Sequence, residues 1–105
     1  MKKYRGKLRA GGVGGQAILV IGDGGSSKLL DHIVRHSPDG FNWGYGGSGP
    51  SDAALSILTD CVGAETANVY YQEFKFDIVA GWKESFEITE KEIKDWLKLK
   101  FLERK

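Results

Sequence analysis

The 105-residue sequence has one cysteine, two prolines and no long apolar segment. Because Cys61 has no second cysteine to pair with, a fold held by internal disulfides is excluded. The longest uncharged run, residues 10–22, is 13 residues long and contains five glycines, which makes it too short and too polar to span a bilayer. The first ten residues are basic but lack the apolar segment of a secretory signal. We therefore expect a cytoplasmic protein, located in the host cytoplasm if the source is viral.

Glycine, in contrast, is abundant, with 15 residues of which 13 lie at or before Gly49. These glycines show no three-residue period, so a collagen-like chain is excluded. A composition of 41% hydrophobic and 28% charged residues is typical of a globular chain, and the length allows one core. We expect a single domain over residues 1–105.

Charge is almost balanced over the whole chain, at a formal net charge of +1, so a nucleic-acid partner is not expected. The first 50 residues nevertheless hold seven Lys and Arg against three Asp and Glu. Five of these cations fall within residues 2–9. Two interpretations stay open: a surface patch that attracts anions, or a strand at a sheet edge whose lysines prevent aggregation.

Apolar periodicity predicts strands in the first half and mostly helices in the second. The expected strands are residues 4–9 (as an edge strand), 17–21, 28–35 and 85–88, with a glycine-rich break at residues 11–15. The expected helices are residues 50–62, residues 65–80 and a last helix that follows Thr89. The fold class is therefore α+β: a small antiparallel sheet from the N-terminal half and one later strand, packed by about three helices from the C-terminal half.

Local signals refine the expected helices. Pro50 suits the first position of a helix, which would place Asp52 in its first turn. Cys61 lies on the apolar stripe of that helix and is expected in the core. Thr89 and Glu92 form a capping box, and Arg104 suits the C-terminal end of the last helix. The last helix is expected to bury Ile93, Trp96, Leu97, Phe101 and Leu102.

The most unusual stretch, residues 36–50, combines five glycines with three aromatic residues and a histidine. Glycine lets a backbone approach a ligand closely, and aromatic faces stack on planar groups. We expect Trp43 and Tyr45 to stack on a ring and the backbone from Gly46 to Gly49 to hold a phosphate, as in a nucleotide-like molecule. The candidate ligand-binding residues are Arg9, His36, Phe41, Trp43, Tyr45, Gly46, Gly47, Ser48, Gly49 and Ser51.

Other interpretations of this stretch remain open. The alternation of Phe41, Trp43 and Tyr45 also fits one face of a strand packed on the core. The match of residues 44–49 to G-x-G-x-x-G does not indicate a dinucleotide fold, because no second parallel strand follows. His36 and Asp39 are an alternative acid–base pair for a small hydrolase or nuclease, although residues 37–40 also read as an ordinary β-turn. Two histidines and one cysteine predict no metal site, and no cofactor is expected.

The block from His36 to Leu58 resembles the signature of a small uncharacterised family found in bacteria, phages and mobile elements. That signature has the form HSPxGFxWGYGGSGPxxxALxIL, and the chain reads accordingly. Weaker similarity is present at residues 4–6, 71–75, 79–80 and 89–93. The resemblance implies no assigned activity; small phage proteins with such domains are sometimes counter-defence factors that sequester host nucleotide signals.

The sequence thus predicts a non-enzymatic protein that binds a nucleotide-like ligand with the loop over residues 36–51, in a counter-defence role if the source is a phage. One alternative is a protein–protein interaction module that inhibits a host protein with the same aromatic loop. The small hydrolase or nuclease is the second alternative. A homo-oligomer, most simply a dimer, is expected because so short a chain rarely forms a deep pocket alone. No membrane partner is expected.

Overall fold

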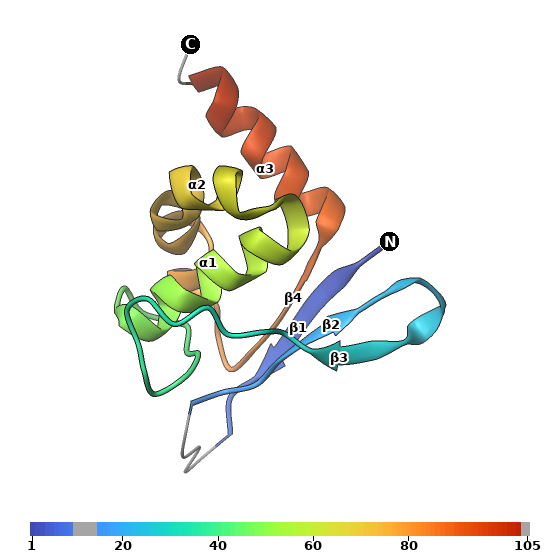
Figure 1. Ribbon diagram of the computed structural model, residues 1–105, viewed down its shortest axis with the longest axis vertical. Helices are drawn as coiled ribbons and strands as arrows, with labels where there is room; N and C mark the ends of the chain where they lie inside the picture. Colours follow the sequence, from blue (N-terminus) through green and yellow to red (C-terminus); the bar gives the residue numbers. More distant parts are fainter. Residues whose placement is uncertain (10–14, 104–105) are drawn as a thin grey trace.

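The computed structural model describes residues 1–9 and 15–103. Most of the predicted glycine-rich break at residues 11–15, and Arg104, lie outside the described residues. The fold is α+β, as predicted: a four-stranded antiparallel sheet carries α1 and α2 on one side, and α3 projects away from the body (Figure 1). The strands are β1 (Lys3–Lys7), β2 (Ile18–Ile21), β3 (Ser27–Leu29) and β4 (Ser85–Thr89). The helices are α1 (Ser48–Val62), α2 (Ala64–Asp77) and α3 (Glu90–Glu103), with short 3-10 turns at Asp23–Gly25 and Val79–Gly81.

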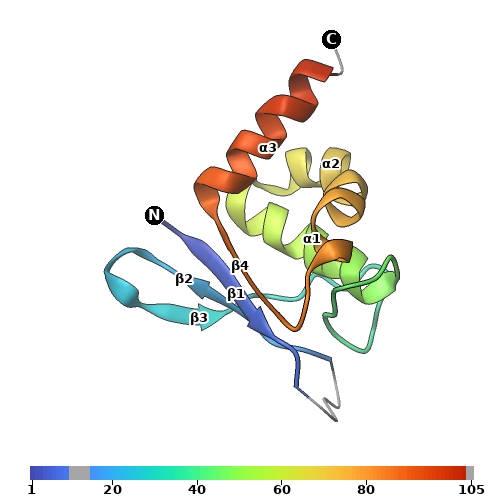
Figure 2. The same cartoon turned by 180° about the vertical axis from the view of Figure 1, so that it is seen from behind.

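Strand β1 lies inside the sheet, so its predicted place at an edge is wrong. The order is β3-β2-β1-β4, with β1 hydrogen-bonded on both sides (Figure 2). Tyr4 lies opposite Val20 on β2 and opposite Ile88 on β4. The first half of the sequence suggested an edge because the second partner, β4, comes some 80 residues later. The interpretation of the N-terminal cations as protection of an edge strand therefore does not hold.

Alternation along the strands separates a buried face from an open one. The inward residues Tyr4, Ile18, Val20, Phe86 and Ile88 are all buried in the core. A Cβ atom on Gly6 would lie 2.5 Å from the ring of Phe86 and 2.6 Å from the ring of Trp43, so only glycine fits there. The opposite face of the sheet carries charged residues, described below.

Helix α1 is buried along most of its length. Its apolar face contributes Ala53, Ala54, Leu55, Ile57 and Leu58 to the core. The helix begins at Ser48 rather than Pro50, so Asp52 lies beyond its first turn, contrary to prediction. Gly63 has a φ of +93° and separates α1 from α2, and its N–H donates to the carbonyl of Thr59.

Helix α3 begins as the sequence predicts. The backbone N–H and hydroxyl of Thr89 both lie 3.1 Å from the Glu92 carboxylate, and the N–H of Glu92 donates back to the Thr89 hydroxyl. Ile93 is fully buried, whereas Trp96 and Leu97 are partly buried. Phe101 and Leu102 are 57% and 54% exposed, so their predicted burial is wrong. The amphipathic pattern of α3 continues beyond the part of the helix that packs against the rest of the protein.

Two smaller expectations have mixed outcomes. Cys61 is partly buried and packs against the core, in line with its predicted place. A strand was predicted over residues 28–35. Strand β3 instead covers only Ser27–Leu29, and the chain from residue 30 to residue 35 is irregular. Among the residues that the structure describes, no helix combines the length and apolarity needed to cross a membrane.

Candidate functional site

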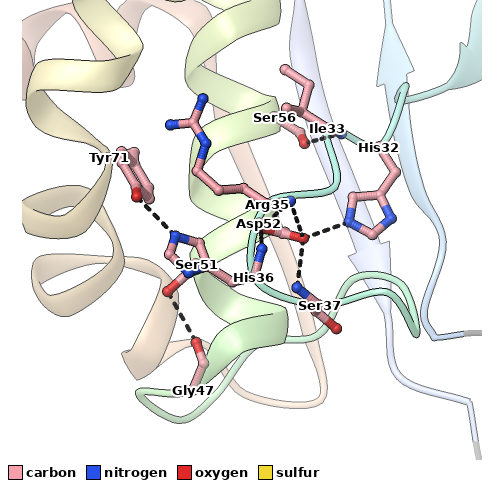
Figure 3. A network of polar contacts seen from close by, with 10 residues as sticks. All are labelled: His32, Ile33, Arg35, His36, Ser37, Gly47, Ser51, Asp52, Ser56 and Tyr71. Atoms are coloured by element: carbon pink, nitrogen blue, oxygen red, sulfur yellow. Dashed lines mark hydrogen bonds and ion pairs between the residues drawn. The ribbon is translucent and has the colours of Figure 1, made fainter.

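A buried carboxylate, Asp52, organises the segment that leads into the glycine-rich loop. Its side chain is 0% exposed, and its oxygens accept hydrogen bonds from the backbone N–H groups of Arg35, His36 and Ser37 at 3.3, 2.9 and 3.0 Å. The Nε2 of His32 lies 2.8 Å from Oδ2 and donates to it, because a carboxylate can only accept (Figure 3). Four hydrogen-bond donors thus surround the negative charge of the Asp52 carboxylate.

The reason for this arrangement lies in the irregular segment before the loop. Within the described residues, only Leu30, at its beginning, is seen to donate its N–H to a strand, at the carbonyl of Ile18 on β2, and buried backbone N–H groups further along need other acceptors. Asp52 supplies one acceptor set, and Ser56, one turn further along α1, accepts from the N–H of Ile33 at 2.9 Å. Two polar side chains on an otherwise apolar helix face therefore fix the path of the chain over α1.

The pKa of Asp52 follows from two opposing effects. Burial raises the pKa of the carboxyl. The hydrogen bonds from His32 and from the N–H groups of Ser37, His36 and Arg35 lower the pKa, and together they outweigh the effect of burial. The net pKa lies below the ordinary value for aspartate. The carboxylate is therefore ionised at neutral pH, although it is buried.

Next to this network, the loop and the start of α1 border an open cavity of about 360 Å³. It is lined by Gly15, Ser37, Asp39, Gly40, Phe41, Asn42, Tyr45, Ser48 and Gly49. The residue before the helix, Gly47, provides no side-chain cap for the first turn. The N-terminal end of α1 therefore faces the cavity without an acceptor from its own cap.

Some predicted ligand-binding residues meet at this cavity. Tyr45, with 49% of its surface exposed, lines it together with Ser48 and Gly49. Phe41 lines it as well, although it is only 5% exposed and also belongs to the core. Asp39, which the sequence suggested for an acid–base pair, also lines the cavity.

Trp43 lies elsewhere, with its ring in the core at 2% exposure. It packs edge-on against Phe86 at 4.8 Å, and its Nε1 donates to the carbonyl of Lys83 at 3.0 Å. A ring in this position offers no face to a ligand, so the expected stacking role of Trp43 is corrected. The alternative, that the alternating aromatic residues pack on the core, holds for Phe41 and Trp43 but not for Tyr45.

At two of the loop positions, close packing requires glycine. A Cβ atom on Gly47 would lie 2.4 Å from the ring of Tyr45, and one on Gly49 would lie 2.7 Å from the Cβ of Asn42. Gly46 lies near Phe76 of α2 and is not part of the cavity lining. Of the glycines expected to hold phosphate, only Gly49 lines the cavity.

The structure does not bring the remaining candidates to the cavity. The Nε2 of His36 lies 2.8 Å from the hydroxyl of Tyr71 on α2, and within the described residues it makes no contact with Asp39 (Figure 3). Ser51 is buried, and its hydroxyl donates to the carbonyl of Gly47 at 3.1 Å. Arg9 lines a different hollow on the open face of the sheet.

Sequence reasoning missed the contact between Asp52 and His32. Asp52 was expected to interact favourably with the helix dipole in the first turn, and no role was expected for His32. The available signal was the spacing of Asp52 and Ser56, four residues apart on the stripe that also carries Leu55. Across residues 1–9 and 15–103, no cluster of three His, Cys, Asp or Glu side chains could hold a metal ion.

Comparison with known proteins gives a family and no activity. The family of unknown function DUF6166 matches residues 4–99, so the chain belongs to that family. No curated protein matches the chain. No solved structure matches it either.

Proposed function

We propose that this member of a family of unknown function binds a small anionic ligand with a planar ring, such as a nucleotide, and does not transform it. One observation carries the proposal. The cavity of about 360 Å³ is lined by Ser48 and Gly49 at the start of α1 and by the half-exposed Tyr45. Its volume lies within the range of small-molecule sites.

The start of α1 supplies the side for the anion. As the first two residues of the helix, Ser48 and Gly49 have N–H groups without an acceptor inside the helix. The helix dipole adds partial positive charge at that end, which favours a phosphate or carboxylate. The negative charge of Asp52 is turned toward the backbone of residues 35–37, where its oxygens are already occupied.

Other residues of the lining suit a ring with polar substituents. The ring of Tyr45 packs over Gly47, which fixes its position while leaving about half of the side chain exposed. Aromatic faces in such positions stack on planar groups. Asp39, which also lines the cavity, offers a carboxylate to hydroxyl or amino donors, such as those of a ribose or a base.

Binding is favoured over catalysis by the positions of the two histidines. His32 is held by Asp52, and His36 contacts Tyr71. Neither residue is part of the cavity lining. The proposed ligand would therefore have no histidine beside it to act as a general base.

Isothermal titration calorimetry with the four nucleoside 5′-monophosphates tests the proposal. We expect saturable binding of at least one of them, weakened about tenfold in Tyr45→Ala by the loss of stacking. The matched control is Phe101→Ala, which removes an aromatic side chain of similar exposure far from the cavity. Absence of binding to all four, or equal affinity in Tyr45→Ala and wild type, would contradict the proposal.

The open face of the sheet favours a second candidate, an interaction module for an acidic protein. Lys3, Arg5 and Lys7 alternate along β1, and Arg9 continues the row. Glu87 pairs with Lys3 and Arg5, whereas Lys7 and Arg9 have no carboxylate partner within the described residues.

The row of cations borders a hollow of about 230 Å³ that also contains the exposed side chains of Leu19 and Leu29. Leucine in place of stacking aromatic residues favours an acidic amphipathic peptide over a single-stranded nucleic acid. For this candidate, Lys7→Glu/Arg9→Glu should abolish binding to the partner, whereas Lys83→Glu should not. Retained binding in the double variant would remove it.

A further inference from the structure

An apolar hollow lies between α2 and α3. It has a volume of about 470 Å³. Its apolar lining comes from Val69 and Tyr70 on α2 and from Leu97 and Phe101 on α3. Val69 and Phe101 are each more than half exposed. A soluble surface rarely leaves such a patch uncovered.

The projecting end of α3 carries further exposed apolar side chains, of which Phe101 lines the hollow while Leu99, two residues earlier, lies on another side of the helix. Leu99, Phe101 and Leu102 are 61%, 57% and 54% exposed, and this end of the helix extends beyond the body in both views (Figures 1 and 2). A helix of 14 residues is marginal on its own, and most of its stability comes from packing. Helix α3 packs through Ile93, Trp96 and Leu97, and Lys100 pairs with Asp77 of α2, so its exposed apolar side chains all follow Leu97.

The charged rim of the hollow indicates what covers it. Glu65 stands at the start of α2 and Lys98 on the second half of α3, and both are exposed. Neither has an ion-pair partner within residues 1–9 and 15–103. The rim of this one hollow therefore carries a negative charge, Glu65, and a positive charge, Lys98, that are not paired within the described residues.

We propose that this surface, the α2–α3 hollow with the projecting end of α3, is a twofold interface between two copies of this chain. A twofold axis requires that a residue pair be formed twice, so that Glu65 of each copy meets Lys98 of the other. The apolar end of α3, with Phe101, then packs into the hollow of the partner copy. A self-complementary rim fits a second copy better than a foreign partner, which would need only the opposite sign.

Sedimentation velocity over a concentration series tests the interface. We expect a monomer–dimer equilibrium for the wild type, and a dissociation constant at least tenfold higher in Phe101→Glu. Circular dichroism verifies that the variant keeps its helices, and Lys7→Glu on the open sheet face is the matched control that leaves the dimer intact. A wild type that stays monomeric, or a dimer that Phe101→Glu does not weaken, would overturn the proposal.

Charge exchange tests the register of the two copies. Glu65→Lys and Lys98→Glu should each weaken self-association, because each places like charges together at both ends of the interface. An equimolar mixture of these two variants should form a heterodimer in which both pairs are again opposite in sign. The double variant Glu65→Lys/Lys98→Glu should dimerise as well. Failure of both rescues would overturn the proposed pairing of Glu65 with Lys98.

Discussion

The glycine-rich loop and the end of α3 contrast in where they place their large apolar side chains. In the loop, Phe41 and Trp43 are 5% and 2% exposed. At the end of α3, Phe101 and Leu102 are more than half exposed. The sequence predicted the reverse, with Trp43 available to stack on a ligand and with Phe101 and Leu102 buried. The difference shows that burial depends on which element lies opposite a side chain as well as on its apolar character.

The physical origin of the contrast lies in the neighbouring elements. Gly6 on β1 leaves room for the ring of Trp43, and Phe86 on β4 contacts that ring from the edge. The loop is thus drawn into the core by strands far away in the sequence. Helix α3 follows β4 directly and projects beyond the body, so the large apolar side chains near its end stay more than half exposed.

The largest expected effect comes from replacing Trp43. We expect Trp43→Ala to lower the free energy of unfolding by about 3–5 kcal/mol, because it empties a core position. Phe101→Ala should change it by no more than about 0.5 kcal/mol at concentrations where the protein is monomeric. Urea denaturation of both variants measures the difference. Similar losses in the two variants would contradict the contrast between loop and helix.

The next effect concerns the carboxylate that holds the loop entrance. Asp52→Ala leaves the N–H groups of residues 35–37 and the imidazole of His32 without their acceptor. We expect a loss of about 3 kcal/mol in the free energy of unfolding, since unsatisfied buried donors lose their hydration as well. Asp95→Ala, which removes only the exposed pair with Lys91, is the control and should fall within about 0.5 kcal/mol. If both variants are equally stable, Asp52 does not organise this segment.

A smaller effect appears on acidification. The folded-state pKa of Asp52 lies below its unfolded value, so its contribution to stability is complete above the unfolded pKa and is lost as pH falls through the folded pKa. We expect about 1.4 kcal/mol for each unit by which the two pKa values differ. The loss should begin below about pH 5 and continue to pH values under the ordinary pKa of aspartate.

The exposed carboxyls of Asp77 and Glu87 also have lowered pKa values, held by Lys100 and Arg5. Denaturation of wild type and Asp52→Asn at a series of pH values separates their contribution from that of Asp52. The wild type should lose more stability than Asp52→Asn over the acid range. Parallel curves would assign the acid dependence to the surface carboxyls alone.

The sequence was sufficient for features that depend on local order. The capping box at Thr89, the end of α1 at Gly63 and the β-branched strand around Val20 all follow from neighbouring residues. The position of β1 could not be predicted, because its pairing with β4 joins residues more than 80 positions apart. The amphipathic stripe of α3 gave no sign of where its packing surface ends, since the pattern does not depend on the length of the opposite element.

The candidate site was predictable only in part for the same reason. Tyr45, Ser48 and Gly49 adjoin each other in the sequence and meet at the cavity. Asp39 meets them across a turn. Asp52 and His32 lie 20 residues apart, one on α1 and the other in an irregular segment. Apolar periodicity within either segment cannot predict a contact between them, so only the folded chain shows it.

The central claim is that the loop, although largely drawn into the core, leaves a ligand site at the start of α1. A titration of the ¹⁵N-labelled protein with a nucleoside 5′-monophosphate, followed by two-dimensional NMR, tests it most directly. We predict saturable shifts in the amide signals of Asp39, Tyr45, Ser48 and Gly49, and none in those of Glu65 and Lys98. Absence of saturable shifts at the start of α1, or shifts centred on Lys7 and Arg9, would contradict the claim.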